Sequence, residues 1–321
     1  MLPLLRLGLI LLAFAPPAKA LPDTASSSQT GWFFDVGAGS EFVHWHETSA
    51  EPYYIRFMNN SGVIDTGSVG TGPDKRFVTE EGLRWRFGVG LSYRFDPDLS
   101  IESRFSTTLG AIGYDGGIQG SRELVPVEPT QYYHYVAGTY DTSFLVYRQK
   151  TTDYTSSTGY QGWQFDLRER GRMGVTRSLF VEELVGVSSR SLLRKVDYTT
   201  SRSHGYNETW DLTWFELGGG PGWRNREWLV GSSFVALIPS SSEETIDWLG
   251  GSSSSLKVKP KANMGVRIGL RVEHVAGARM ELSYESRSFK LSDPVSIGSG
   301  IVIMQPASVE KLGRLDLGWC F

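Results

Sequence analysis

The sequence predicts an all-β fold, a closed antiparallel transmembrane β-barrel of about ten strands. Three observations lead to this prediction. Long segments alternate apolar and polar residues with a period of two, which is the pattern of strands rather than helices. Short turns and long polar segments alternate along the chain, and the first twenty residues have the layout of a secretory leader.

The chain begins MLPLLRLGLILLAFAPPAKA. Arg6 supplies a positive charge, an apolar run follows over residues 7–15, and Ala18-Lys19-Ala20 is a small-residue cleavage site. The apolar run is too short to span a bilayer, since a spanning helix needs roughly 20 residues. We therefore predict a cleaved signal peptide over residues 1–20, a periplasmic N-terminal segment over 21–30 and a barrel over 31–321.

Composition excludes several classes of function. The formal net charge is -3, from 32 basic and 35 acidic residues, so nothing favours a nucleic-acid partner. Cys320 is the one cysteine, which excludes a disulfide framework and a thiolate metal site. We expect no metal and no cofactor. Parity places Cys320 on an inward face as a free thiol.

The first three strands carry the clearest pattern. Residues 31–48 open the mature domain, with Trp32, Phe34 and Val36 on one face. Residues 83–95 read LRWRFGVGLSYRF, in which every second residue is apolar and the other face carries glycine, serine and arginine. Asp96-Pro97-Asp98 forms a tight turn, and alternation then resumes, so 79–96 and 98–113 form a hairpin.

Seven further segments repeat this alternating pattern. Trp163, Phe165 and Leu167 mark the strand 158–174, and Trp210, Leu212 and Trp214 supply the apolar face of the strand 206–223. The remaining predicted strands are 179–195, 227–240, 256–274, 279–290 and 310–321. Because ten is an even number, we expect the first and the last strand to have their free ends on the short-turn side.

Long polar segments separate the hairpins at 49–79, 114–157, 196–205, 241–256 and 291–309. Short turns at one end and long loops at the other are typical of membrane barrels, with the short turns periplasmic and the loops extracellular. Within 114–157, Tyr133 and Tyr135 with Phe144 and Val146 predict a strand pair that projects above the membrane. If this pair crosses the membrane, the barrel has twelve strands. The tyrosines at 132, 133 and 135 fit an aromatic girdle at the membrane interface better than a partner-binding patch.

The final strand ends in an aromatic residue with no polar tail, at Leu315, Leu317, Trp319 and Phe321. Signal peptide, alternating strands and this ending resemble bacterial outer-membrane β-barrel proteins. The resemblance implies a location in the outer membrane and contact with its lipid and lipopolysaccharide. It also implies that Leu315, Leu317, Trp319 and Phe321 form the signal recognised by the barrel-insertion machinery.

The face opposite the apolar residues carries interspersed charge of both signs. Its predicted lumen network comprises Asp35, Glu41, Arg84, Arg86, Arg94, Glu102, Arg104, Asp166, Arg168, Arg267, Arg271, Glu281, Glu285, Arg314 and Asp316. We assign Asp211, Arg279 and Arg287 to the same face. These charges either interlock as a plug or line an aqueous pore. Barrel size favours the plug, because open channels belong to barrels of about 16–18 strands.

Size and strand number are similar to the omptins, outer-membrane proteases of ten strands that use an Asp pair and an Asp–His pair at the extracellular rim. This sequence departs from that pattern, because segment 241–256 has no histidine and 114–157 has no closely spaced Asp pair. The remaining catalytic candidates are His44, His46, Asp115, His204 and Asp247. His44 and His46, beside Glu41 and Glu47, share one strand face and could bind a metal or act as base and orienter.

The sequence thus predicts a structural or surface-interaction barrel with a charge-lined, plugged lumen and function in its extracellular loops, rather than an enzyme. A small-solute channel is the first alternative. A hydrolase at the outer rim, omptin-like or other, is the second.

Overall fold

The computed structural model describes residues 30–58, 64–118, 124–128, 130–137, 140–149, 152–196, 206–248, 255–296, 302–303 and 305–321. The predicted signal peptide and His204 lie outside these residues. No helix among the described residues is long and apolar enough to cross a bilayer.

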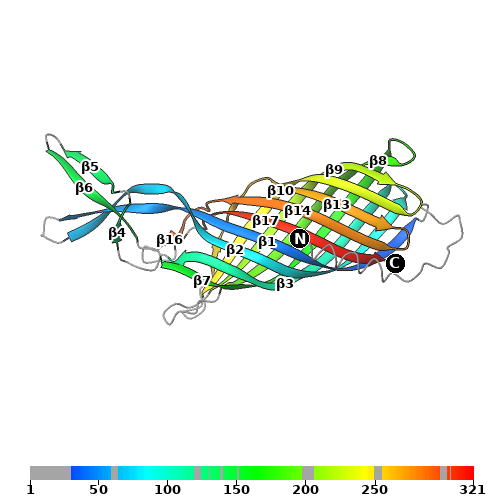
Figure 1. The fold of residues 1–321 in the computed structure, drawn as a ribbon, viewed down its shortest axis with the longest axis horizontal. Helices are drawn as coiled ribbons and strands as arrows, with labels where there is room; N and C mark the ends of the chain where they lie inside the picture. Colours follow the sequence, from blue (N-terminus) through cyan, green and yellow to red (C-terminus); the bar gives the residue numbers. More distant parts are fainter. Residues whose placement is uncertain are drawn as a thin grey trace.

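Ten antiparallel strands close into a barrel, which confirms the predicted number (Figure 1). They are β1 (Gly31–Met58), β2 (Ile64–Asp96), β3 (Leu99–Ile118), β7 (Thr152–Gly174), β8 (Leu179–Val196), β9 (Tyr206–Arg224), β10 (Trp228–Trp248), β13 (Gly265–His274), β14 (Ala278–Lys290) and β17 (Ala307–Cys320). Each strand pairs with the next, and β17 closes the ring by pairing with both β14 and β1. Closure matters because an unpaired backbone group in lipid costs several kcal/mol.

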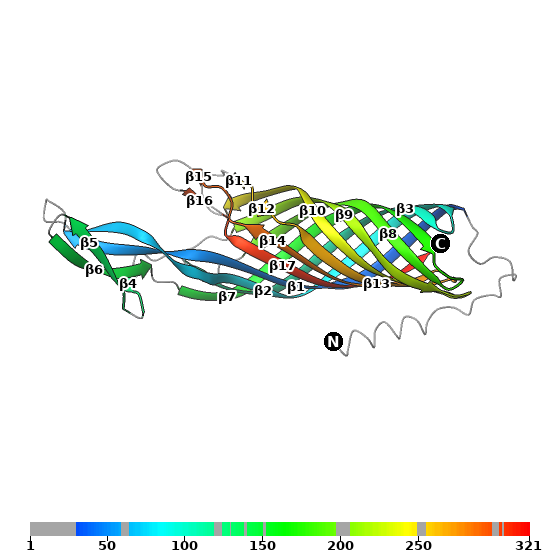
Figure 2. The same ribbon diagram turned by 90° about the horizontal axis from the view of Figure 1, so that it is seen from above.

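The outer face of the barrel carries an apolar band. On β2 the outward side chains from Leu83 to Phe95 are apolar and mostly exposed, and on β9 the band runs from Phe215 to Trp223. We take this band as the membrane-spanning part of the barrel, since lipid solvates apolar side chains on the outside of such a sheet. The four predicted short turns connect strands at one end, where the C-terminus also lies (Figures 1 and 2). Gly31 lies at the same end, since it pairs with Arg94 just before the first short turn.

At the opposite end, strands β1 and β2 continue beyond the barrel as one long hairpin (Figure 1). The segment 49–79, expected as a polar loop, is therefore largely strand. Three further strands join it: β4 (Leu124–Pro126), β5 (Tyr132–Ala137) and β6 (Tyr140–Gln149). Strand β6 pairs with β1, β4 and β5, which builds a projecting sheet. The predicted extra strand pair is confirmed, and it does not cross the membrane.

The predicted strand 256–274 is broken in the structure. Besides β13 it contains β11 (Leu256–Val258), which pairs with β10, and β12 (Lys261–Ala262), which pairs with β14. Pro260 lies between the two short pieces, and proline lacks the N–H that a continuous ladder needs. A separate small hairpin, β15 (Val295–Ser296) with β16 (Val302–Ile303), lies in the predicted polar segment 291–309.

Candidate functional site

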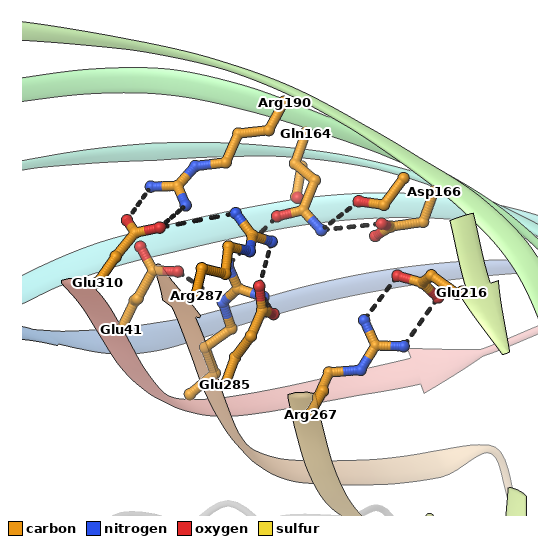
Figure 3. Close-up of polar contacts among 12 residues, drawn as sticks. Glu41, Gln164, Asp166, Arg190, Glu216, Arg267, Glu285, Arg287 and Glu310 are labelled. Atoms are coloured by element: carbon orange, nitrogen blue, oxygen red, sulfur yellow. Dashed lines mark hydrogen bonds and ion pairs between the residues drawn. The ribbon is translucent and has the colours of Figure 1, made fainter. Parts of the chain in front are cut away.

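The inward side chains of the spanning strands form a network of ion-paired groups, part of which Figure 3 shows. Its centre is Arg314, whose Nε donates to Glu41 at 2.5 Å and whose Nη1 donates to Glu285 at 2.9 Å. Strand register produces these contacts, since Glu41 lies directly opposite Arg314 on β17 and opposite Arg84 on β2. Arg84 completes the group with a 2.5 Å bond to Glu41. Alternation along each strand and register between strands thus place opposite charges side by side.

Similar groups continue along the inward face of the spanning strands. Glu216 accepts bonds from Arg267 at 2.7 and 2.8 Å and from Arg168 at 2.7 Å. Glu102 accepts from Arg170 at 2.9 Å and from Arg271 at 3.1 Å. Further inward pairs are Arg86–Asp316, Arg190–Glu310, Arg287–Glu310 and Arg279–Glu281. Buried ions are tolerated when each is paired and hydrogen-bonded in this way.

Sequence reasoning missed several members of this network, among them Arg170 on β7, Arg190 on β8, Glu216 on β9 and Glu310 on β17. Arg170 has the same parity as the predicted Arg168 on β7, so parity alone could have found it. Glu216 has the same parity as Trp210, Leu212 and Trp214, and the wrong assignment of those residues to the outer face hid it.

Above the network, an aromatic plug of Trp45, Trp210, Trp214 and Phe289 fills the lumen. Trp45 and Trp210 contact at 5.0 Å between ring centroids, and Trp210 and Phe289 contact at 5.2 Å. Arg287 lies 5.1 Å over the Trp214 ring, a cation–π arrangement. Trp210, Leu212 and Trp214 were predicted as the apolar face of the spanning strand, and this assignment is wrong, because all three are buried in the lumen.

The outward positions of the same stretch differ accordingly. Asp211, predicted on the inner face, is exposed on the outside of β9. The lipid-facing apolar residues of this strand begin only at Phe215.

The two layers together occupy the middle of the lumen. Between the ion pairs, a cavity lined by residues such as Arg86, Gln164 and Asp166 measures about 10 Å³. A site needs roughly 10–15 Å³ to hold a single water, so this space does not form a path for solutes. The chemistry of the middle lumen is therefore that of a packed, charge-paired core.

Four carboxylates gather at the outer end of the barrel, beyond the apolar band. This outer carboxylate cluster consists of Glu47, Glu80, Glu208 and Glu244. Arg194 contacts three of them, at 2.6 Å to Glu80, at 3.4 Å to Glu47 and in a closer pair with Glu208. Burial raises the pKa of Glu208 to about 7 and raises the pKa of Glu244 well above its usual value. Arg194 is one positive charge beside four buried carboxylates. The protonated form of these carboxyl groups is therefore favoured at this end of the barrel.

The catalytic candidates that the structure describes are not brought together. His44 and His46 lie on the outside of β1, whereas Glu41 and Glu47 point into the lumen. His44 Nδ1 lies 3.3 Å from Glu81 on the neighbouring strand. Asp115 is exposed on the outside of β3, and Asp247 is exposed on β10, with β13, β14 and β17 between it and β1. Among the described residues, no group of three or more His, Cys, Asp or Glu is arranged to hold a metal ion.

The tyrosines of segment 114–157 lie on β5 in the projecting sheet. Tyr132 is 59% exposed, Tyr135 is 54% exposed and Tyr133 is 36% exposed. The interpretation as a membrane girdle is wrong, because β5 lies beyond the barrel wall and pairs only with β6 among the described strands.

The last strand closes the ring at the short-turn end. Phe321 N–H donates to the Phe34 carbonyl at 2.8 Å, and Phe34 N–H donates back at 3.3 Å. Leu315, Leu317 and Trp319 pair with Ser40, Ala38 and Val36 of β1. The residues of the predicted assembly signal are therefore also the residues of the closing seam.

Comparisons with known proteins support the fold. No protein-family model and no curated protein matches the chain. Among solved structures, the outer membrane protease OmpT from Escherichia coli is 10% identical over 93% of this chain and 99% of its own, with a TM-score of 0.52. The toluene transporter TbuX of Ralstonia pickettii is 11% identical over 91% of this chain and 89% of its own, with a TM-score of 0.32. The Ail protein of Yersinia pestis is 10% identical over 91% of this chain and all of its own, with a TM-score of 0.26. The likeness to OmpT supports an outer-membrane β-barrel fold for this chain.

Proposed function

We propose that this protein is a sealed outer-membrane barrel that binds a partner at the cell surface through its projecting sheet. The observation that carries the proposal is the pairing of a filled lumen with strands that continue far beyond the barrel. Arg314, Glu216 and the aromatic plug occupy the middle of the barrel, which supports a lumen closed to solutes. A barrel that conducts no solute serves as a membrane anchor. Its function is then carried by the strands that project beyond the barrel.

The projecting sheet suits a binding role because it is ordered by its own contacts. Ile55, Val127 and Val146 are buried within it, and Val127 N–H donates to the Val146 carbonyl at 3.1 Å. Arg56 lies 4.8 Å over the Tyr147 ring. Its strand β5 offers exposed Tyr132, Tyr133 and Tyr135 for contact. Tyrosine gives large contact area at low cost in side-chain entropy, which is why binding surfaces use it.

Lipopolysaccharide is the proposed membrane partner. Outward lysines follow directly above the apolar band, with Lys311 beside His44 on β1 and Lys290 opposite Lys261. Such positions face the phosphate groups of the outer leaflet. Replacing Lys290 and Lys311 together by Gln is expected to reduce the lipopolysaccharide that copurifies with the barrel, and unchanged copurification would contradict this assignment.

The test combines conductance with surface binding. Purified protein in planar bilayers is expected to give no large, stable conductance steps, whereas a small-solute channel would give them.

Cells that display the protein are then applied to arrays of immobilised glycans and peptides. Binding is expected to fall in a variant with Tyr132, Tyr133 and Tyr135 changed to Ser, and to persist when the exposed barrel residue Lys195 is changed to Gln. Equal binding by both variants would contradict the role of β5.

The alternative of a rim hydrolase finds less support in the geometry, because His46 and the inward carboxylates lie on opposite faces of β1. If the protein did hydrolyse peptides or lipids through this site, His44→Ala and His46→Ala would abolish the activity.

A further inference from the structure

A cavity of about 880 Å³ lies at the short-turn end of the barrel, which we call the vestibule. Residues of all four short turns line it, including Pro97, Ser178, Asn225 and Ala276, so its mouth lies between the turns. Its inner end reaches the ion pairs around Arg168. The volume falls within the range of small-molecule sites, roughly 300–1,000 Å³.

The vestibule carries excess positive charge. Nine arginines line it against six side-chain carboxylates. Three of these arginines, Arg168, Arg172 and Arg279, pair with carboxylates that lie behind the lining. Several carboxylates already have partners, with Asp98 2.8 Å from Arg224 and Glu102 3.1 Å from Arg271. Three arginines line the vestibule with no carboxylate within ion-pair distance among the described residues, namely Arg94, Arg177 and Arg226. Arg177 and Arg226 belong to the turns at the mouth, so the positive field begins where a solute would enter.

Arg104 is the vestibule residue that most clearly indicates a bound ligand. Its side chain is 11% exposed, its Nε has no hydrogen-bond partner, and its nearest carboxylate oxygen, on Asp316, is 3.9 Å away. The positions of the barrel wall next to Arg104 are glycines, at Gly37 on β1 and Gly88 on β2. A Cβ on Gly37 would lie 3.0 Å from Arg104 Nη2, and a Cβ on Gly88 would lie 3.1 Å from Arg104 Nε. A buried guanidinium with unused donors is costly unless an acceptor reaches it.

We propose that the vestibule binds a small anionic solute from the periplasm, with its carboxylate or phosphate group on Arg104. A guanidinium offers a planar fork of donors that matches the oxygens of either group. Arg94, whose guanidinium lies 4.8 Å over Phe33, provides a second charge between the mouth and Arg104. This site is separate from the projecting sheet and does not depend on the proposed surface function.

Cys320 makes the proposal testable with the protein as it exists. It is the only cysteine of the chain, it is free, and it lines the vestibule. The rate of its alkylation by iodoacetamide, a small neutral reagent, is measured by mass spectrometry in detergent. Inorganic phosphate and citrate are added in separate arms, against chloride at equal ionic strength and pH. We expect phosphate, citrate or both to slow alkylation and chloride not to, and the effective anion identifies the group that the site takes.

Two variants locate the effect. In Arg104→Gln the protecting anion is expected to bind about tenfold more weakly, the loss of one charged hydrogen bond. Lys257→Gln, at the other end of the barrel, serves as the control and should retain full protection. Arg104→Lys keeps the charge and should protect partly, which covers the case in which the glutamine variant does not fold. Absence of protection in the unmodified protein, or equal protection in a folded Arg104→Gln barrel, would overturn the proposal.

Discussion

Arg314 is the side chain on which the mid-lumen contacts converge, since Glu41, Glu285 and Gln164 all accept from it. Changing Arg314 to Leu leaves buried carboxylates with one partner fewer. Removing one member of a buried ion pair costs about 3–5 kcal/mol, so we expect a loss of that order in the free energy of unfolding. Urea titration of the refolded barrel measures it. Lys257→Ala breaks an exposed pair with Glu243 and should cost no more than about 1 kcal/mol, and equal losses in both variants would contradict the prediction.

Glu208 makes the outer end of the barrel sensitive to pH. Burial raises its pKa from 4.5 to about 7, beyond the membrane-spanning part of β9. A proton is therefore held more tightly in the folded state, and this contribution to stability is complete below pH 4.5 and lost as pH rises through 7. Its full size is on the order of 3 kcal/mol.

We expect Glu208→Gln to remove part of the fall in unfolding temperature between pH 5 and about pH 8, while Glu244 retains the remainder. Thermal unfolding at a series of pH values measures the difference between the variant and the unmodified protein. Glu243→Gln, at an exposed site, should leave the pH profile unchanged. Parallel profiles for Glu208→Gln and the unmodified protein would show that Glu208 does not hold the proton.

At the scale of single strands, the apolar face changes sides at the membrane boundary. On β9, Trp210, Leu212 and Trp214 face the lumen, whereas Phe215 and Leu217 face outward. Water surrounds the upper barrel and lipid surrounds the lower barrel, so the apolar side chains turn inward above the boundary and outward below it. The adjacent pair Trp214-Phe215 marks the switch, and Phe42-Val43 marks it on β1. The sequence contains this signal, but a single alternating pattern applied to the whole strand misses it.

The projecting sheet was harder to predict than the barrel. The hairpin around Tyr133 and Phe144 follows from local alternation, and the structure pairs these two residues directly. The pairing of β6 with β1, through Tyr54 and Tyr147, joins segments that are distant in sequence. Polar strands outside the membrane bury little on either face, so no periodic pattern reports which partner they choose. The same holds for the vestibule, which depends on how four separate turns are placed.

Gly222 shows how one strand depends on its neighbour. Gly222 lies opposite Phe180 of β8, and a Cβ at this position would overlap the Phe180 ring. Phe180 is 1% exposed and lies between the guanidinium groups of Arg172 and Arg224, at 5.8 and 5.9 Å from its ring centroid. Gly222→Val is therefore expected to cost about 1–3 kcal/mol by overpacking.

The neighbouring strand offers a matched control for this change. Gly231 pairs with Gly222, and a Cβ at Gly231 meets nothing within 4 Å. Gly231→Ala should leave the urea midpoint nearly unchanged. If the two substitutions cost the same, crowding at Phe180 is not the cause.

For the whole molecule, each layer along the barrel axis has its own solvent and its own chemistry. The projecting sheet and the outer carboxylate cluster lie in water, the ion pairs lie within the lipid band, and the vestibule opens at the short-turn end. The ring of ten strands holds these layers in line, and it exists only if β17 reaches β1. Closure is therefore the property on which every site described above depends.

The closing seam gives a prediction for the molecule as a whole. Deleting residues 318–321 removes the pairs of Gly37, Val36 and Asp35 with β17 and both hydrogen bonds between Phe34 and Phe321. Each backbone group left unpaired in lipid costs several kcal/mol, so the shortened chain should fail to refold in detergent and should show no heat-dependent shift in gel mobility. Phe321→Ala keeps the backbone bonds and should refold in detergent. In cells the same variant should accumulate less folded barrel, if the terminal aromatic is read by the insertion machinery. Normal refolding of the shortened chain would show that the ring closes without this seam.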